Sequence, residues 1–346
     1  MADDQLTYRD AGVDIGGAER SLRAVMPSIQ ATYNDRVIAG VGGFGGLFQG
    51  EFPDLERPVL VSSIDGVGTK TKVAAMVGDF SGLGKDIVNH CVNDILCQGA
   101  RPLFFMDYFA SSRIDPAVFT QVLGGAAEAC MAVGAVLLGG ETAEMPGVYL
   151  DEEIDLVGSI VGVVDMERRL PRGKILPGDA VIGIASVGLH TNGFSLARTA
   201  LFEHGGLSVR DLVPGMETTI GEELLRPHKS YFNAVYPILQ EIEGVRGAAH
   251  ITGGGLYGNL PRAMHANVQA VLDRRSWTPL PIFRLIQEAG NVSDVEMFTT
   301  FNMGIGMALV VSKDVADEVV GRLNESGEAA AKIGYIQKGA HDVQIV

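Results

Sequence analysis

The stretch PVLVSSIDGVGTK, residues 58–70, is the clearest structural signal in this chain of 346 residues. Its first part, residues 58–64, is rich in β-branched residues and predicts a strand. The strand leads directly into Asp-Gly-Val-Gly-Thr-Lys at 65–70. Glycines at a strand end let the backbone approach a phosphate closely and point N–H groups at it. The stretch therefore predicts a strand followed by a polar, ligand-binding turn.

Strands and helices alternate through most of the chain. The first fifty residues show little sustained periodicity, and the glycine-rich segment 40–50 reads as a mobile loop. Beyond residue 70, apolar runs predict strands, and apolar residues at a 3.6-residue period predict helices. The predicted strands span 101–111, 135–138, 154–165, 180–186, 268–273, 304–311 and 332–337. The predicted helices span 84–98, 115–133, 192–203, 229–241, 282–288 and 314–324.

The length favours two domains, at about 150 residues per domain. Residues 166–177 (MERRLPRGKILP) combine a basic run with two prolines, which is typical of a connection between domains. We place the boundary there, which gives domains 1–170 and 171–346. Because strands and helices interleave in both halves, each domain is predicted to be mixed α and β. The alternation does not distinguish parallel from mixed sheets.

Composition excludes several classes of protein. With 47% hydrophobic and 20% charged residues, the chain can bury a large core. Its 27 basic and 42 acidic residues give a net charge of −15, which argues against a general binder of nucleic acid or anionic membranes. The longest apolar run, 129–138, is well short of the roughly 20 residues that cross a bilayer. The first residues lack the pattern of a signal peptide.

The three cysteines, Cys91, Cys97 and Cys130, form no CxxC pair. An odd number of cysteines without a disulfide pattern fits a reducing compartment. We therefore expect a soluble, cytoplasmic protein.

Glycine is unusually frequent, at 45 of 346 residues, about 13%, against an average of about 7%. A single glycine cluster is as often a tight turn as a ligand site. Here five clusters each lie beside a predicted strand end or loop, and four carry polar residues able to hold phosphate or metal. This repetition favours a polyphosphate site. The clusters are 40–46, 66/68, 139/140, 188/193 and 253–258.

Two familiar nucleotide-binding motifs do not fit. A Walker loop needs glycine immediately before its lysine, but Thr69 precedes Lys70. A Rossmann site needs GxGxxG at the end of a strand, with an acid about twenty residues further on. The spacing of Gly40, Gly42 and Gly45 resembles that motif, but no convincing strand precedes it.

Three acidic residues are candidate magnesium ligands. Asp65 follows the first predicted strand, and Glu141 follows two glycines after another. Asp94 lies mid-helix in the apolar stretch CVNDILC, where an acid is costly unless it is paired or binds a cation. Magnesium takes one or two carboxylates together with water and phosphate oxygens. A solvated turn remains the alternative for Asp65, and an ordinary buried carboxylate the alternative for Asp94.

Other charged residues are weaker candidates. Asp107, in FFMDYF, is more readily explained by a structural role. Asp86 and His90 flank Asp94 on neighbouring helical turns, and we expect them to form a solvated or supporting stripe. Arg198 and Arg262 could add charge to a phosphate site, although a surface position is as plausible.

Two of the seven histidines stand beside glycine turns. His190 lies in GLHTNGFSLAR, and His250 precedes Thr252 and three glycines. A histidine there can act as acid, base or electrostatic partner near neutral pH; a packed or surface histidine is the alternative for each. The segment TGGGLYGNLPRAM, residues 252–264, predicts an anion site at a helix N-terminus with Asn259 as its cap.

Together these motifs resemble those of the phosphoribosylformylglycinamidine cyclo-ligase family, also called aminoimidazole ribonucleotide synthetases. Single pieces occur in sister enzymes of the same ATP-binding superfamily, whereas the full ordered set is specific. The motifs run nearly end to end: YRDAGVDI, GGFGGL, SIDGVGTK, CVNDILCQGARPLFFMDY, LLGGETAEMPG, GLHTNGFSLAR, HITGGGLYGNLPR and FNMGIGM.

The resemblance implies a PurM-type α+β protein with two mixed α/β domains, whose N-terminal domains pair into a dimeric β-barrel. It implies a homodimer that converts formylglycinamidine ribonucleotide and ATP to 5-aminoimidazole ribonucleotide, ADP and phosphate, with Mg²⁺ required. In the family mechanism, ATP phosphorylates the formamide oxygen. An internal nitrogen then attacks that carbon, and phosphate leaves as the imidazole ring closes.

Each candidate residue has an expected role in that reaction. The three acids hold Mg²⁺ on ATP, Lys70 offsets phosphate charge, and His190 or His250 stabilises the amide oxygen or moves a proton. The glycine loop folds over the phosphates of ATP, and the turn at 252–258 could hold the substrate phosphate. The residues expected to bind the nucleotide or its phosphates are Gly42, Gly43, Gly45, Gly46, Asp65, Gly66, Gly68, Thr69, Lys70, Asn192, Thr252, Gly253, Gly254 and Gly255.

Sister families fit less well. Selenophosphate synthetases carry a reactive cysteine or selenocysteine near the N-terminus, and hydrogenase-maturation relatives end in a functional cysteine, whereas this chain ends AHDVQIV. Kinase-like relatives such as thiamine-monophosphate kinase place an acid where His250 stands. A non-catalytic nucleotide-binding scaffold would keep the glycine turns but tolerate losing the carboxylates that are present here.

Overall fold

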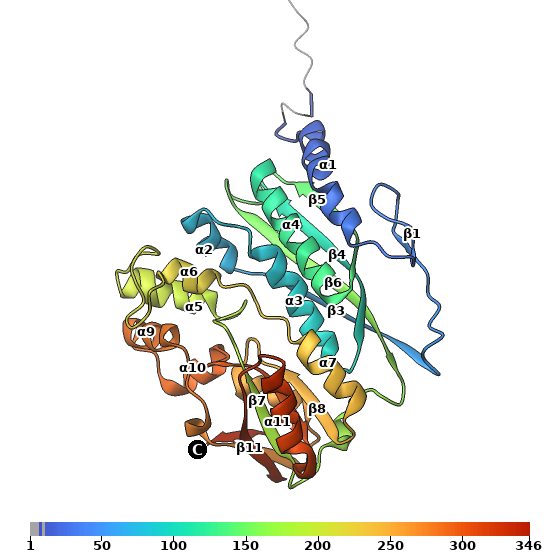
Figure 1. The fold of residues 1–346 in the computed structure, drawn as a ribbon. Coiled ribbons are helices and arrows are strands. Elements are labelled where there is room, and N and C mark those ends of the chain that lie inside the picture. Colours follow the sequence, from blue (N-terminus) through green and yellow to red (C-terminus); the bar gives the residue numbers. More distant parts are fainter. Residues whose placement is uncertain (1–6, 9–10) are drawn as a thin grey trace, which may run out of the picture. The chain divides into compact units, whose positions relative to one another are not determined.

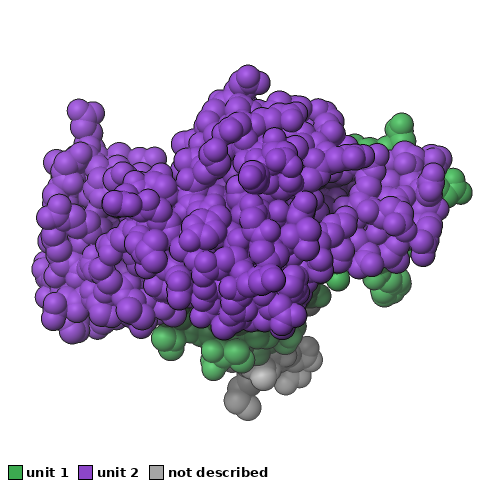
Figure 2. All heavy atoms as spheres, turned by 90° about the horizontal axis from the view of Figure 1, so that it is seen from below, with its two compact units in different colours: residues 1–52, 62–91, 102–161 green, residues 53–61, 92–101, 162–346 purple. Residues whose placement is uncertain are grey.

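The computed structural model describes residues 7–8 and 11–346, which form two compact units (Figure 1). Residues 1–6 and 9–10, which carry part of the segment assessed for a signal peptide and part of YRDAGVDI, lie outside the described residues. Unit 1 comprises the segments up to residue 52, 62–91 and 102–161; unit 2 comprises 53–61, 92–101 and 162–346 (Figure 2). The chain thus passes between the units several times. The single boundary at residue 170 stays a prediction.

Unit 1 is built on a four-stranded sheet with strand order β3-β6-β4-β5. These strands are β3 (Pro58–Gly66), β4 (Arg101–Ser111), β5 (Val136–Glu144) and β6 (Ile154–Asp165). Strands β4 and β5 run parallel, with Phe104 opposite Val136 and Ser111 opposite Glu144. The predicted strands 58–64, 101–111 and 154–165 are confirmed.

Helices α3 (Leu83–Leu96) and α4 (Pro116–Val133) cover one face of this sheet (Figure 1). Helix α1 (Ile15–Ala31) packs against α4 and β5, and the short α2 (Lys70–Val77) follows the turn after β3. Asp115 caps α4 by accepting hydrogen bonds from the first N–H groups, and a proline opens the helix. Ile87, Cys91 and Ile95 form a buried stripe along α3.

Among the described helices, α4 alone is long and apolar enough to cross a membrane. Half of its most apolar window is buried inside the fold. Because α4 packs between α1 and the sheet strand β5, the protein core accounts for its apolar character.

The other face of the unit 1 sheet carries exposed apolar side chains. Exposure alternates along β3, and Ile64 is 69% exposed. On β4, Met106 is 39% exposed between the buried Phe105 and Asp107. Such alternation is typical of a sheet covered on one face. Over residues 7–8 and 11–346 the sheets are open and form no closed barrel.

Three expectations for unit 1 need correction. The first fifty residues contain α1, whose buried positions Ser21, Val25 and Ile29 recur every four residues. A polar serine and the internal Pro27 obscure this pattern in the sequence. The segment 40–50, read as a loop, contains the strand β2 (Leu47–Phe48), which pairs antiparallel with β1 (Val37–Ala39) just before it. The strand predicted over 135–138 continues to residue 144, because its pairing with β4 extends that far.

Unit 2 is built on a six-stranded sheet with order β12-β9-β11-β7-β10-β8. All of its pairs are antiparallel except β12 with β9. The strands are β7 (Ala180–Ala185), β8 (Val245–His250), β9 (Val268–Leu272), β10 (Ile305–Val311), β11 (Ala330–Lys338) and β12 (Val343–Ile345). Both units are therefore mixed α and β, as predicted.

Helices α7 (Phe232–Glu241) and α11 (Ala316–Glu325) pack against this sheet around a core that includes Ile182, Tyr231 and Leu309. Helix α8 (Gly255–Ala263) lies beside β8 and β12. The predicted helix 192–203 is α5 (Phe194–Arg198) continued by a π-helix. The remaining helices are α6 (Ile220–Leu225), α9 (Pro281–Gly290) and α10 (Asp294–Thr300).

Candidate active site

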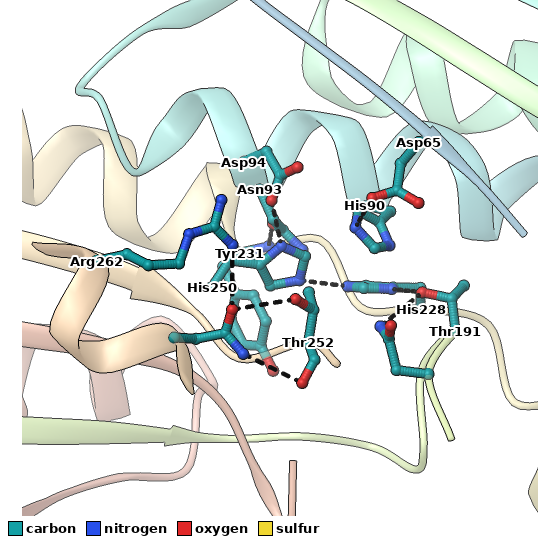
Figure 3. Close-up of polar contacts among 12 residues, drawn as sticks. Asp65, His90, Asn93, Asp94, Thr191, His228, Tyr231, His250, Thr252 and Arg262 are labelled. Carbon is teal, nitrogen blue, oxygen red and sulfur yellow. Dashed lines mark hydrogen bonds and ion pairs between the residues drawn. The ribbon is translucent and has the colours of Figure 1, made fainter. Parts of the chain in front are cut away.

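In unit 1, strand β3 ends in the turn that the sequence predicts as a ligand site. Asp65 Oδ2 lies 3.0 Å from Nε2 of His90, which projects from α3. The Asp65 side chain is 42% exposed, whereas that of His90 is only 4% exposed. Of the two alternatives expected for His90, a solvated or a supporting position, the structure favours the supporting one, because the ring is buried against Asp65. The other carboxylate oxygen, Oδ1, accepts a hydrogen bond from the backbone N–H of Gly66 at 2.7 Å, so the protein orients both oxygens of this partly exposed carboxylate (Figure 3).

The turn continues into α2 through Gly68, whose φ of 66° lies in the left-handed region that favours glycine. Lys70 Nζ lies 2.8 Å from Asp86 Oδ1, and both side chains are fully buried. Burial lowers the pKa of Lys70, and the carboxylate opposes that shift. Asp86 is therefore not solvated, and its position agrees with the supporting alternative that the sequence left open. The role of Lys70 toward phosphate stays a prediction, since its ammonium is directed at a buried partner.

The loop between β1 and β2 is anchored at its ends and open in its middle. A Cβ on Gly40 would lie 2.0 Å from the hydroxyl of Tyr33, and one on Gly46 would lie 2.4 Å from Leu138. No neighbouring atom lies within 4 Å of a Cβ built on Gly42, whose φ is 112°. The ends of the loop are thus packed tightly against neighbouring side chains, whereas open space surrounds Gly42.

The structure separates two of the predicted magnesium ligands. Asp65 lies on β3 and Glu141 on β5, which are the opposite edge strands of the unit 1 sheet. Two strands lie between them, so the strand axes are about 14 Å apart at 4.7–4.9 Å per strand. That spacing argues against a single Mg²⁺ ion bound by both Asp65 and Glu141 of the same sheet.

Asp107 is buried on β4, and burial raises the pKa of its carboxyl to about 7. A Cβ on Gly140 of the neighbouring strand would lie 2.3 Å from Asp107 Oδ1. The carboxyl borders a small cavity of about 50 Å³ that is also lined by Phe119 and Leu137. This apolar setting agrees with the structural role expected from the sequence.

In unit 2, four side chains form one hydrogen-bonded chain (Figure 3). His250 Nδ1 lies 2.8 Å from Asp94 Oδ1. His250 Nε2 lies 2.9 Å from Nε2 of His228, and His228 Nδ1 lies 3.2 Å from Thr191 Oγ1. Both histidines and the threonine are buried, whereas the Asp94 side chain is 30% exposed.

An ionised Asp94 fixes the protons along this chain. The carboxylate accepts, so His250 carries its proton on Nδ1 and presents a bare Nε2. His228 then donates from Nε2, and its bare Nδ1 accepts from the hydroxyl of Thr191. One proton on each ring therefore satisfies every contact in the chain.

His190 packs against this chain. Its ring stacks on that of His228 with centroids 4.2 Å apart and an angle of 26° between the planes. Its backbone φ is 63°, a left-handed conformation that costs a non-glycine residue about 1–3 kcal/mol and occurs most often at functional sites. Ligand atoms of His190, His228 and His250 lie within 4.8 Å of one another, but stacking and direct hydrogen bonding indicate a packed cluster.

Asn93, beside the acid on α3, holds the segment that carries His228. Its amide donates to the carbonyl oxygen of Lys229 at 2.8 Å, and its oxygen accepts from the backbone N–H of Tyr231 at 2.9 Å. Sequence reasoning missed Asn93 and His228. No glycine turn or charge pattern marks His228 within RPHKSYFN, and only its spatial neighbours reveal it.

The glycine turn before α8 is built differently from the prediction. Asn259 is not the cap, because α8 begins at Gly255 and places it inside the helix. Left-handed Gly254 and Gly255 turn the chain into the helix five residues earlier than expected, with Gly254 in place of Asn259 as the cap. The Asn259 amide donates to the carbonyl oxygens of Thr252, Gly253 and Gly255 at 3.2, 3.1 and 2.9 Å. It therefore locks the turn from inside the helix.

Two further candidates lie at this turn. A Cβ on Gly253 would lie 3.1 Å from Oδ1 of Asn192, so the amide is directly against the glycine backbone. Arg262, which is exposed, donates to Asn259 Oδ1 at 3.2 Å (Figure 3). Unit 2 thus gathers a glycine turn, two amides and a guanidinium, which are groups that bind a phosphate.

Comparison with known proteins supports the fold first. Models of the AIR synthase related protein match at residues 54–164 for its N-terminal domain and 177–346 for its C-terminal domain. Thiamine-monophosphate kinase from Stenotrophomonas maltophilia K279a superposes with a TM-score of 0.70 at 18% identity, covering 95% of this chain and 96% of that one. Hydrogenase maturation protein HypE in complex with ATP gives 0.69 at 16% identity, covering 95% and 90%. The chain is thus a PurM-type α+β protein related to AIR synthase.

Sequence relatives define the family within that class. The phosphoribosylformylglycinamidine cyclo-ligases of Geotalea uraniireducens and Citrifermentans bemidjiense are 45% and 46% identical over 338 residues, covering 98% of this chain and 97% of theirs. The chain belongs to the phosphoribosylformylglycinamidine cyclo-ligase family. This confirms the resemblance seen in the sequence, and the kinase, at 18% identity, shares the fold alone.

Proposed function

We propose that the residues of the two units described above carry the ATP-dependent ring closure of purine biosynthesis. The chain is a ligase that cyclises formylglycinamidine ribonucleotide to 5-aminoimidazole ribonucleotide. The observation that carries this function is 45–46% identity to cyclo-ligases across 98% of the chain. ATP as the second substrate is supported by the fold shared with HypE, whose structure contains ATP.

Asp65 and Asp94 are the proposed ligands of Mg²⁺ on ATP. Each is a partly exposed carboxylate with one oxygen held by a buried histidine, His90 in one case and His250 in the other. Carboxylate oxygens are the protein ligands that Mg²⁺ prefers, and a buried partner that orients a ligand is typical of metal sites. When bound, the metal would neutralise charge on the transferring phosphoryl group. The position of Glu141 on the other edge strand does not support it as a ligand of the same ion.

The glycine turns are proposed to hold phosphates. The loop at Gly42–Gly46 folds over the triphosphate, and Gly66, Gly68 and Thr69 supply backbone N–H groups. Lys70 acts from behind this turn, and its buried pair with Asp86 supports that positioning role better than direct phosphate contact. The turn at Thr252–Gly255, with Asn192, is proposed to bind the substrate phosphate.

Phosphorylating an amide oxygen requires positioning and charge neutralisation more than a protein nucleophile. Burial raises the pKa of Cys97 and Cys130, which disfavours a reactive thiolate. Ring closure then joins two groups of one molecule and releases a proton. His190 and His250 are proposed to stabilise the amide oxygen or take that proton. Because both ring nitrogens of His250 are hydrogen-bonded, its protons move along the chain through His228.

The proposal includes a cytoplasmic homodimer. Residues 1–170 are assigned ATP binding and dimerisation through a shared β-barrel, and 171–346 the phosphate-binding turns. The exposed Ile64 and Met106 on the sheet of unit 1 support an apolar interface with a second copy. The three free cysteines fit a reducing compartment.

ADP release tests the function. Purified protein with ATP and Mg²⁺ is expected to form ADP only when formylglycinamidine ribonucleotide is added, with one 5-aminoimidazole ribonucleotide formed per ADP. Boiled protein is the control for contaminating substrate breakdown. Nucleotide binding without turnover would favour a non-catalytic scaffold instead.

A further inference from the structure

Unit 2 contains a groove of about 500 Å³ that none of the roles above uses. It is lined by part of the basic run at 166–177, by the C-terminal end of α7 and by the first residues of β8. The sequence marks that run as a connection between domains, a role that does not require its four basic residues. Small-molecule sites typically enclose about 300–1,000 Å³, so the groove has room for a small ligand.

The groove is separate from the histidine chain of the same unit. Strand β8 begins at Val245, which lines the groove, and ends at His250, which belongs to the chain. Five residues of extended strand span about 16 Å at about 3.3 Å per residue. A ligand in the groove therefore lies well away from the residues to which we assign the reaction.

We propose that this groove binds a ribonucleoside 5′-monophosphate, an inference that does not depend on the proposed function. Such a ligand has three parts: a phosphate group, a ribose with two hydroxyl donors, and a flat base with apolar faces. The groove offers a matching group for each part.

Two exposed cations match the phosphate. Arg168 Nη1 donates to Oε1 and to the backbone oxygen of Gln240, at 2.6 and 3.3 Å. Lys174 Nζ donates to the backbone oxygen of Arg169 at 3.0 Å. Both cations thus hydrogen-bond to uncharged oxygens. A phosphate monoester carries a charge of about −1.5 to −2 at pH 7, which these two positive charges balance through charge-assisted hydrogen bonds.

The other charged groups of the groove favour one phosphate over several. Arg246 is paired with the buried Asp179 at 2.9 Å, and Glu167 is paired with Arg57 at 3.0 Å. Glu243 adds an exposed carboxylate, and its negative charge opposes a second and a third phosphate. The same carboxylate is an acceptor for the hydroxyls of a ribose.

An apolar floor matches the base. Ile242 and Val245 belong to the core of unit 2, and the half-buried Leu170 and Leu239 pack against that core. A flat base that covers these side chains removes apolar surface from water. Because the core holds the floor in place, little conformational entropy is lost on binding.

Paired charge substitutions test the inference. Calorimetry is expected to give a Kd for adenosine 5′-monophosphate (AMP) below about 1 mM, both without and with saturating ADP and Mg²⁺. The double variant Arg168→Gln/Lys174→Gln should raise that Kd at least tenfold. Melting temperatures show whether each variant is folded.

The same basic run supplies a matched control. Arg169 and Arg172 are exposed and do not line the groove. The double variant Arg169→Gln/Arg172→Gln removes the same two charges from the same segment, so it reports any general attraction of AMP to a basic surface. Its Kd for AMP should stay within twofold of wild type.

A further variant addresses the ribose. In Glu243→Gln, the preference for AMP over 2′,3′-dideoxyadenosine 5′-monophosphate should fall at least threefold, because an amide oxygen is a weaker acceptor than a carboxylate. Comparing two ligands in each protein cancels the effect of the lost charge on the phosphate. An unchanged preference would show that the carboxylate does not hold the ribose.

The remaining outcomes separate this inference from its alternatives. Equal losses in the two double variants would reduce the site to general electrostatic attraction and overturn the inference. Inorganic phosphate that binds as tightly as AMP would show an anion site that does not recognise a nucleotide. AMP binding that is abolished by ADP and unchanged in Arg168→Gln/Lys174→Gln would belong to another site. Failure to turn over formylglycinamidine ribonucleotide would overturn the proposed function alone, since the groove is tested by binding.

Discussion

His228 lies between two residues that the sequence singles out, yet it belongs to no motif. Its Nε2–H donates a hydrogen bond to Nε2 of His250, and its Nδ1 accepts one from the hydroxyl of Thr191. His250 in turn holds one oxygen of Asp94. Because His228 is buried, its removal leaves an unsatisfied acceptor, at a cost of about 1–3 kcal/mol. The ring of His250 would then be free to change tautomer, and the carboxylate would lose its fixed orientation.

Replacing His228 should therefore affect the metal as well as turnover. We expect His228→Leu to lower kcat about tenfold, equivalent to about 1.4 kcal/mol, and to raise the Mg²⁺ concentration needed for half-maximal rate. His228→Gln should recover most of both, because its amide N–H can donate to His250. His204→Leu, at an exposed histidine, controls for the loss of an imidazole. Wild-type kcat and Mg²⁺ dependence in His228→Leu would remove the residue from the site.

The sequence could reveal only part of this arrangement. Asp94 is visible because an acid inside an apolar helix needs a partner, and His250 because it precedes a glycine turn. Their contact joins residues 156 positions apart, and no local pattern encodes it. The burial of Lys70 and its pairing with Asp86 were hidden for the same reason.

At the scale of elements, helices α3 and α4 are packed so closely that a glycine is required. A Cβ on Gly84 of α3 would lie 1.9 Å from the carbonyl oxygen of Val122 and 2.4 Å from the backbone N of Ala126, both on α4. Backbone atoms cannot rotate away as a side chain can. A methyl group there forces the two helices apart and weakens the layer that supports His90.

We expect Gly84→Ala to destabilise the protein by about 1–3 kcal/mol, the range for overpacked sites. Gly124→Ala is the matched control, because Gly124 lies on α4 and a Cβ added to it would meet no atom within 4 Å. That change should stabilise by about 0.5–1 kcal/mol, since alanine is the better helix former. Urea unfolding measures both. Equal shifts of the two midpoints would show that the close approach of α3 and α4 carries no cost.

The sequence predicts well those helices and strands whose bounds are set by residues close together in the chain. Strands β4 and β6 and helix α4 have the predicted bounds to within a residue, because alternation and the Asp115 cap are read from neighbouring residues. The full length of β5 depends on pairing with β4, and the start of α8 on two left-handed glycines. Helix α1 is stabilised by packing on α4, which the sequence of its own segment does not contain.

At the scale of the whole molecule, association must overcome charge. Each copy carries a net charge of −15, so two copies repel each other, and salt weakens that repulsion. An apolar surface can supply the opposing free energy. The sheet face with Ile64 and Met106 offers such a surface, whereas the helices occupy the other face.

A charge placed in this face should separate the copies. Light scattering is expected to give twice the 36.6 kDa chain mass for the wild type and the chain mass for Ile64→Asp, because a carboxylate buried in an apolar interface has no partner. Leu212→Asp, at a 63% exposed residue of unit 2, should leave the dimer intact. Raising the salt concentration should tighten the wild-type dimer without rescuing Ile64→Asp. A dimer that persists in Ile64→Asp would move the interface to another face, and a wild-type monomer at micromolar concentration would leave the exposed apolar strands without their proposed partner.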